Sequence, residues 1–250
     1  MPALCFGVGE KIVFIGDSIT DCGRRTEEQG PYGRGYVSLV RAFLHARYPA
    51  HGLTIVNRGI GGNTIRNLAA RWQEDVLAEE PDWLSVKVGI NDVGRLIIGN
   101  LADHVPLAEY EATYRTLLQQ TPAVTNGKLI LMEPYVIEPP LRGDPAAVSG
   151  VSLAEVQQKF ADLRASGARD DAVYHAGWMH FRYYIDAYID AVRRLAAEFD
   201  AIVVHTQTAF DLAMEAQPPA VWAQDRIHPD TPGHAVIARA FLEAVGYGDV

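Results

Sequence analysis

Residues 12–20 read IVFIGDSIT, an apolar run that ends at a glycine and continues into polar residues. The first four of these residues predict a short buried strand, because β-branched and aromatic runs bounded by glycine are typical of strands inside a sheet. Gly16, Asp17 and Ser18 then predict a turn into a helix. A serine there presents its hydroxyl outward, and its N–H lies near the positive end of the helix. The simpler alternative is that Asp17 or Ser18 only caps the helix.

The alternation of short apolar runs and helical patterns continues along the chain. We expect further strands at 53–56, 83–88, 129–132 and 201–204, and helices at 35–48, 65–77, 107–120, 181–199 and 232–245. Strands that alternate with amphipathic helices predict a parallel sheet with helices on both faces. Because no repeat or linker divides this pattern, we expect a single domain over residues 1–250.

Residues 142–177 interrupt this alternation. We interpret the segment as an insertion of roughly thirty residues, because connections of this length are uncommon in compact domains and are usually functional. Its residues 153–165 predict a helix. At its C-terminal end are flat side chains of the kind that stack on sugar rings or bury at subunit contacts, namely Tyr174, His175, Trp178 and Phe181. We expect the segment to border the functional site; the alternative is that its aromatic residues pack on a core of their own.

Composition and charge exclude several classes of protein. The 250 residues include 22 basic and 31 acidic side chains, which gives a net charge of −9. This balance argues against nucleic acid or an anionic membrane as the main partner, since both need a basic surface. No apolar stretch has the length of a transmembrane helix, and residues 1–11 do not resemble a secretory signal. Cys5 and Cys22 cannot form a disulfide framework. We therefore expect a cytoplasmic protein.

Three further segments place glycines or polar residues where strands end or where the last helix begins. Residues 57–64 (NRGIGGNT) follow the second strand, 89–92 (GIND) follow the third, and 225–229 (DRIHP) precede the last helix. The carboxyl ends of parallel strands meet at one edge of the sheet, where open α/β sheets bind ligands. Gly62 can leave its N–H free there, and the Asn91 amide can donate to an anion. Each segment alone is also explained as an ordinary turn, with Asp92 as the cap of the next element.

Asp225 and His228 have the spacing of a carboxylate that orients a catalytic base. Three residues apart on a helical turn, the two side chains share one face. The carboxylate can then reach Nδ1 while Nε2 faces a nucleophile. An ordinary surface ion pair is the alternative. His234 suggests a metal site together with His228, but the sequence offers no convincing third ligand, and we expect no metal.

Together, the four segments resemble the signature blocks of the SGNH (GDSL) hydrolase superfamily, and the resemblance extends over nearly the whole chain. It implies a flavodoxin-like three-layer α/β/α sandwich with a five-stranded parallel sheet. It also implies that Ser18 is the nucleophile, that His228 is the general base and that Asp225 orients it. The oxyanion hole would consist of the Ser18 N–H, the Gly62 N–H and the Asn91 side chain.

A narrower resemblance is to the acetylxylan esterase branch, in residues 14–22, 62–64, 71–72, 89–93 and 225–229. It implies a serine esterase that removes acetyl groups from carbohydrates such as xylo-oligosaccharides, with no metal or organic cofactor. Candidate substrate contacts are Asp17, Asn63, Trp178 and Trp222. Gly94 departs from the branch, in which a tryptophan is expected at this place, and would open one wall of the site.

Two other functions stay open on the sequence. A lysophospholipase or acyl-thioesterase of the same superfamily would need an apolar groove for its acyl chain. A catalytically inactive carbohydrate-binding protein on this fold is the other, although every expected catalytic residue is present. The partner that we expect is a small ester, most simply an acylated sugar, and neither nucleic acid nor a membrane. We also expect a homo-oligomer.

Overall fold

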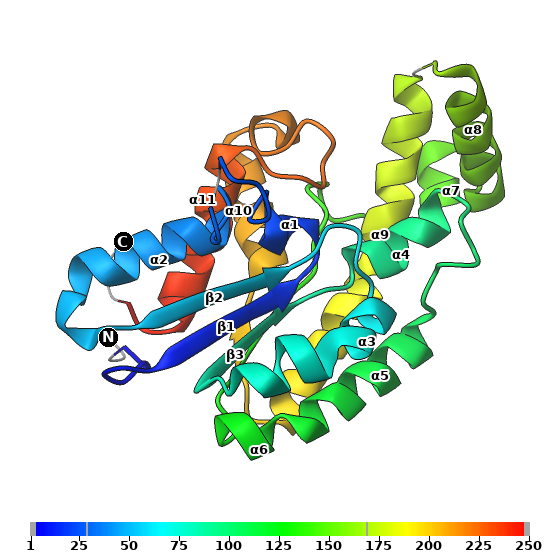
Figure 1. Ribbon diagram of the computed structural model, residues 1–250. Helices are drawn as coiled ribbons and strands as arrows, with labels where there is room; N and C mark the ends of the chain where they lie inside the picture. The colour runs from blue at the N-terminus through cyan, green and yellow to red at the C-terminus, as the bar shows by residue number, and fades with distance from the viewer. Residues whose placement is uncertain (1–3, 29, 169, 248–250) are drawn as a thin grey trace.

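The computed structural model describes residues 4–28, 30–168 and 170–247, and a five-stranded parallel sheet lies at its centre (Figure 1). The strands are β1 (Lys11–Gly16), β2 (Thr54–Gly59), β3 (Trp83–Lys87), β4 (Leu129–Met132) and β5 (Ile202–Val204). Their order is β2-β1-β3-β4-β5, with every neighbouring pair parallel. This order is that of flavodoxin-like folds, and it confirms the expected α/β architecture.

Helices cover both faces of the sheet (Figure 1). One layer contains α2 (Tyr36–Arg47), α10 (Thr206–Ala216) and α11 (Thr231–Ala244), and the other contains α3 (Ile65–Asp75), α5 (Leu107–Gln120) and α9 (Asp171–Glu198). The inner strands β1 and β4 are buried from both sides, which explains why they read as continuous apolar runs.

Shorter helices complete the described chain. They are α1 (Ser18–Asp21), α4 (Ile90–Ile97), α6 (Pro122–Thr125), α7 (Pro145–Ser149) and α8 (Leu153–Ser166), with 3₁₀ turns at Pro49–His51, Leu77–Glu79 and Pro219–Val221. The sequence patterns did not indicate α4 or α10. The helix expected to begin near Phe181 begins ten residues earlier, because the Asp170 side chain caps it by accepting from the N–H groups of Ala172 and Val173.

The expected insertion is mostly helical. The helices α7 and α8 and the first half of α9 project from the carboxyl edge of the sheet, at the upper right of Figure 1; we call α8 with the first half of α9 the helical hairpin. Within it the Phe160 ring packs on α9 at Gly177, where an added Cβ would lie 2.7 Å from the ring. Two side chains tie α8 to α4: Gln157 donates to the Leu96 carbonyl at 2.7 Å and Arg164 to that of Ile98 at 2.8 Å.

The turn after β1 packs closely on the ends of β2 and β3. Its helix α1 lies so close to the end of β2 that a Cβ on Gly59 would come within 2.2 Å of the Asp21 nitrogen. A Cβ on Gly16 would come within 2.4 Å of the Lys87 carbonyl oxygen. Both contacts are with backbone atoms, which cannot rotate away. Glycine at these two positions therefore allows α1 to sit directly on the strands.

We predict that Gly59→Ala lowers the free energy of unfolding by about 1–3 kcal/mol, because the added methyl forces α1 away from β2. Urea denaturation monitored by circular dichroism measures the change. Gly94→Ala is the matched control: its Cβ would meet the Phe181 ring at an ordinary 3.5 Å, and alanine is the better helix former. Equal stability of Gly59→Ala and the native chain would show that α1 is not held against β2.

Candidate active site

Ser18 is the first residue of α1, directly after the strand and its turn. The preceding residue, Asp17, is fully buried and its Oδ1 accepts from the Ile19 N–H at 3.0 Å. Burial raises the pKa of the Asp17 carboxyl, and the buried Lys87 ammonium opposes that shift. In this structure the Asp17 carboxyl is enclosed and caps the helix, and it is not among the residues that line the cavities beside Ser18 and His228. The Ser18 side chain remains accessible at the rim of a cavity.

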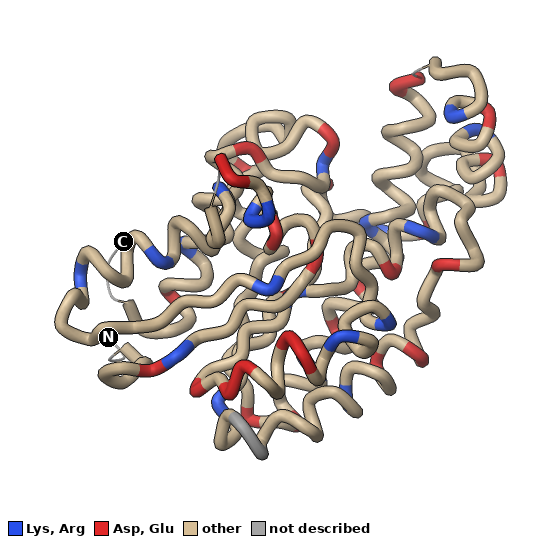
Figure 2. Tube along the Cα trace, in the orientation of Figure 1, with Lys and Arg blue, Asp and Glu red and all other residues tan. Residues whose placement is uncertain are grey.

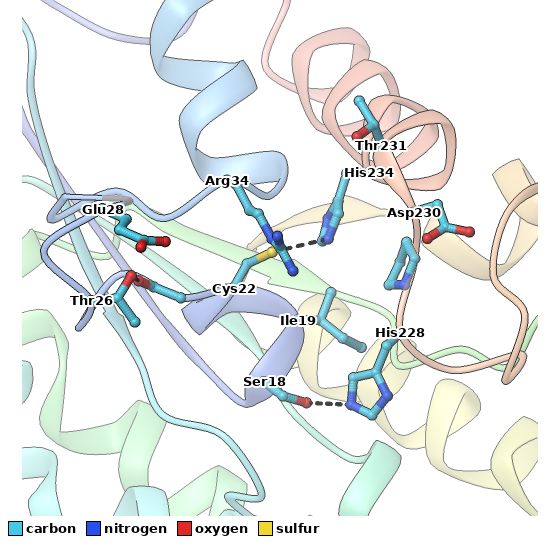
Figure 3. Close-up of a pocket in the computed structure, with 12 residues that line it drawn as sticks. Ser18, Ile19, Cys22, Thr26, Glu28, Arg34, His228, Asp230, Thr231 and His234 are labelled. Carbon is cyan, nitrogen blue, oxygen red and sulfur yellow. Dashed lines mark hydrogen bonds between the residues drawn. The ribbon is translucent and has the colours of Figure 1, made fainter.

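Ser18, His228 and Asp225 form a continuous chain of hydrogen bonds. The Ser18 Oγ lies 3.0 Å from His228 Nε2 (Figure 3), and His228 Nδ1 lies 2.7 Å from Asp225 Oδ2. The loop that holds the last two is an irregular turn and not the helical turn expected. Asp225 Oδ1 shapes it by accepting from the backbone N–H groups of Ile227 and His228, while Arg226 adopts a φ of +64°.

Asp225 and His228 each stabilise the charged form of the other. The hydrogen bond to Asp225 raises the pKa of His228, against the effect of partial burial. Partial burial opposes ionisation of Asp225, but the hydrogen bonds from the His228 ring and from two backbone N–H groups outweigh it and lower the pKa of Asp225. The pair therefore favours an ionised carboxylate beside a histidine that is readily protonated, as a base in acyl transfer requires.

The loop after β2 places backbone N–H groups beside Ser18. Gly61 lies near enough that an added Cβ would be 3.8 Å from the Ser18 Cβ, and its N–H donates to Asp21 Oδ2 at 3.2 Å. Gly62 adopts a φ of +78°, which favours glycine. Within the described parts of the chain, the N–H groups of Ser18 and Gly62 donate to no protein acceptor. Both are available to a ligand.

The third strand and α4 bring Asn91 and Asp92 to the same edge. Asn91 Nδ2 donates to the Asn63 carbonyl at 3.0 Å, which orients the amide and leaves its second hydrogen for another acceptor. Asp92 lies inside α4, so it is not the cap expected from the sequence. Its Oδ1 instead accepts from the Ile65 N–H at 2.9 Å, and burial raises its pKa to about 7. It thereby fastens the start of α3, the helix after the Gly62 loop.

Two cavities meet at His228. One has a volume of about 550 Å³ and lies on the side of the loop between α1 and α2; it includes Ser18 and is mostly polar (Figure 3), with Thr26, Glu28, Arg34, Asp230 and Thr231 in its walls. The other, about 380 Å³, runs between α4 and the helical hairpin and is mostly apolar. We call them the polar cavity and the apolar groove. The helical hairpin therefore borders the residues that the sequence singled out.

The three remaining candidate substrate contacts lie in different parts of the structure. Trp178 lines the apolar groove, and the Arg226 guanidinium lies 4.7 Å above its ring. The side-chain oxygen of Asn63 accepts from Arg71 at 2.8 Å, so that group already supports the loop. Trp222 donates to the Gln217 carbonyl at 3.4 Å and lies in the wall of neither cavity. The structure brings only Trp178 to the site.

His234, which the sequence suggested as a metal ligand, has protein partners on both ring nitrogens. Its Nδ1 accepts from the Tyr36 N–H at 3.2 Å, and its Nε2 lies 3.3 Å from the Cys22 sulfur (Figure 3). Burial lowers the pKa of His234 to about 4. Among the described residues, no group of three or more His, Cys, Asp or Glu side chains is arranged to hold a metal ion.

Sequence reasoning missed Arg95, which lines the apolar groove one helical turn after Asn91. The i, i+4 spacing from a suspected oxyanion residue was a usable signal. Charged residues of both signs are mixed along the chain trace (Figure 2). Within the residues that the structure places, no helix is both long enough and apolar enough to cross a membrane.

Comparisons with known proteins identify the family of the chain. Residues 14–236 match the model of the GDSL-like lipase/acylhydrolase family. The chain is 40% identical over 247 residues to an acetylxylan esterase of Geobacillus stearothermophilus, with 96% of each chain covered. The crystal structure of a catalytic mutant of that enzyme superposes with a TM-score of 0.79 at 38% identity, covering 97% of each chain.

A second solved structure, LAE5, is an alpha/beta hydrolase enzyme from the metagenome of Lake Arreo in Spain. It gives a TM-score of 0.78 at 38% identity, over 99% of this chain and all of its own. Catalytic mutants of the Geobacillus enzyme replace a serine, an aspartate and a histidine, with the histidine three positions after the aspartate, as His228 follows Asp225 here. The chain belongs to the GDSL-like lipase/acylhydrolase family.

Proposed function

We propose that this chain is a serine esterase that removes acetyl groups from carbohydrates such as xylo-oligosaccharides, with Ser18 as nucleophile. The observation that supports this most directly is the chain of hydrogen bonds from Ser18 Oγ through His228 to Asp225. The identity of 40% to an acetylxylan esterase supports the substrate class.

The geometry accounts for each step of acyl transfer. His228 Nε2 takes the proton of Ser18 Oγ as that oxygen attacks the ester carbonyl, and Asp225 holds the ring in the required tautomer. The tetrahedral intermediate then expels the alcohol, which receives the proton from His228. Water attacks the resulting acyl-enzyme, with His228 again as base. The second tetrahedral intermediate releases the acid, and His228 returns its proton to Ser18 Oγ. The chemistry needs no metal or organic cofactor.

The anionic oxygen of the intermediate needs preorganised donors. The candidate donors are the Ser18 N–H at the start of α1, the Gly62 N–H and the second hydrogen of the Asn91 amide. Such donors stabilise developing charge without reorganising during the reaction, and one of them contributes on the order of 10²–10³ in kcat. The hydrogen bond from Asn91 to the Asn63 carbonyl fixes the orientation of this amide.

The polar cavity supports a hydroxyl-rich alcohol. Ser18 and His228 form one end of it, and Thr26, Glu28 and Asp230 offer donors and acceptors along its walls. A sugar that carries the acetyl group can therefore lie there while its ester carbonyl reaches Ser18. The chemistry of the walls suits a neutral polyol better than an extended hydrocarbon.

The structure fits the two alternative functions to different degrees. An inactive carbohydrate-binding protein would not need a histidine hydrogen-bonded to both a serine and a carboxylate. The apolar groove beside His228 keeps an acyl-thioesterase or lysophospholipase as the second candidate, and the ratio of activities on acetate and octanoate esters separates the two. A single domain with an insertion at 142–177, a homo-oligomer and a cytoplasmic location stay predictions.

We predict that Ser18→Ala lowers kcat for a neutral aryl acetate by about 10⁴–10⁶, because covalent catalysis is lost while binding remains. Steady-state kinetics measures the change, and circular dichroism verifies the fold. Ser166→Ala, an exposed serine at the end of α8, is the control and keeps native activity. Activity of Ser18→Ala within tenfold of the native enzyme would contradict the assignment.

We predict that Asp225→Asn lowers kcat/KM by up to ~10⁴ and moves the acid limb of the pH profile to lower pH. The base must be neutral to act, so activity disappears as pH falls through the pKa of His228. Asp225 raises that pKa, and its loss lets the midpoint fall. Asp190→Asn, an exposed carboxylate on α9, leaves the profile in place. An unmoved midpoint in Asp225→Asn would show that another group orients His228.

A further inference from the structure

The apolar groove is far larger than an acetyl group requires. It measures about 380 Å³, whereas a methyl group is comparable in size to a water molecule, whose share of liquid volume is ~30 Å³. Its walls are aromatic and aliphatic side chains from α4, the helical hairpin and the Asp225–His228 loop, namely Ile90, Ile97, Phe160, Trp178, Phe181 and Ile227. Gly94 leaves room for the groove, because an added Cβ would point at the Phe181 ring.

One cationic side chain lies inside this apolar surface. Arg95 follows Asn91 by one turn of α4, so both side chains face the groove. Its terminal NH2 nitrogen lies 3.5 Å from the Gly62 carbonyl oxygen, a long hydrogen bond, and its Nε is buried without a hydrogen-bond partner. In the described chain no carboxylate lies within ion-pair distance of it. The guanidinium is therefore unpaired beside the suspected oxyanion site.

Two other arginines of this protein with little exposure are paired with carboxylates. Arg182 holds Asp211 with two hydrogen bonds of 2.6 and 2.9 Å, and Arg71 holds Asp75 at 2.5 Å. The acid that lines the groove, Asp225, is already bonded to His228. At the outer end Arg164 donates to the Ile98 carbonyl and adds a second cation, also without an acidic partner among the described residues. The groove thus combines apolar walls with uncompensated positive charge.

A bound ligand can supply the carboxylate that would pair with the Arg95 guanidinium. Burying a charge without a partner is unfavourable, and a guanidinium binds a carboxylate through two parallel hydrogen bonds. The apolar walls favour a ring or short hydrocarbon, and Trp178 offers a flat face for it. Since the whole chain has a net charge of −9, general attraction of anions does not explain this local arrangement.

We infer that the apolar groove binds a carboxylate-bearing part of the ester substrate, with the apolar body of that part between α4 and the helical hairpin and its carboxylate on Arg95. The inference rests on the proposed esterase chemistry at Ser18 and narrows its substrates to esters that carry a carboxylate. Where that carboxylate is on the acyl group, the group removed is larger than acetyl. The acidic part is attached through the alcohol or through the acyl group. The chemistry in the groove is the same in both cases, and matched substrates distinguish them.

The test compares kcat/KM for pairs of esters that differ only in a carboxylate and its neutral amide. In the alcohol arm the pair is 4-acetoxybenzoate and 4-acetoxybenzamide. In the acyl arm it is the 4-nitrophenyl monoester of glutaric acid and the same ester of glutaramic acid. Each arm gives one ratio, which is kcat/KM for the anionic ester divided by kcat/KM for its neutral amide. General effects of a mutation on catalysis cancel in this ratio.

We expect the native enzyme to prefer the anion by tenfold or more in one arm, and Arg95→Gln to reduce that preference by about 10–100-fold, as expected for loss of a charged hydrogen bond. Arg95→Lys retains part of it, because charge remains without the planar fork. The control is Arg47→Gln on the exposed side of α2, which removes the same charge far from the groove and leaves both ratios unchanged.

Three results would overturn the inference. The first is a native ratio near one in both arms. The second is a ratio that Arg95→Gln leaves unchanged while kcat/KM stays at the native value for both esters. The third is the same unchanged ratio with an equal fall in kcat/KM for anion and amide, which would make Arg95 a support of the Gly62 loop. Melting temperatures verify that the variants fold. Arg95→Lys provides a second measurement of how the preference for the anion depends on this side chain. Labelling of Ser18 by a phosphonate tests the esterase function separately, so that failure of one proposal is not taken for failure of the other.

Discussion

The hydrogen bond of 3.0 Å between Ser18 Oγ and His228 Nε2 joins two residues that are 210 positions apart in the chain. Ser18 belongs to the turn after the first strand, and His228 to the loop before the last helix. The bond forms only if the sheet order brings both ends of the chain to one edge, and only if α1 lies flat on β2. The close approach at Gly59 and the parallel order of the strands serve that one contact.

Two contacts hold the loop that contains Asp225 and His228. The Ile137 N–H donates to the Arg226 carbonyl at 2.9 Å, and the Arg226 guanidinium lies over the Trp178 ring. The second contact connects the helical hairpin to the position of His228. The hairpin therefore does more than form a wall of the apolar groove, because its aromatic face also helps to fix the loop that holds the base. Substrate selection and positioning of the base share one structural element.

The sequence predicted the sheet, and it also singled out Ser18, Asp225 and His228, which the structure joins by hydrogen bonds. Both outcomes have a physical reason. Buried parallel strands are uniform apolar runs, and residues 12–20 combine such a run with the turn that exposes Ser18. What it predicted poorly depends on tertiary contacts. Asp17 resembles a surface residue of an active-site motif, yet packing of α1 encloses it. The apolar groove is formed by α4 and the helical hairpin, two elements distant in sequence. The i, i+4 spacing puts Arg95 on the same face of α4 as Asn91, but no local pattern indicates that this face lines a groove.

The central claim is that Ser18 becomes acylated during turnover, and mass spectrometry tests it most directly. Native enzyme mixed with excess neutral aryl acetate, quenched in acid within milliseconds and digested, gives a peptide map of any covalent adduct. The account predicts one acetyl group on the peptide that contains Ser18, which decays at the rate of deacylation and is absent from Ser18→Ala. Rapid turnover without an adduct, or acetyl on a different residue that decays at the catalytic rate, would contradict it.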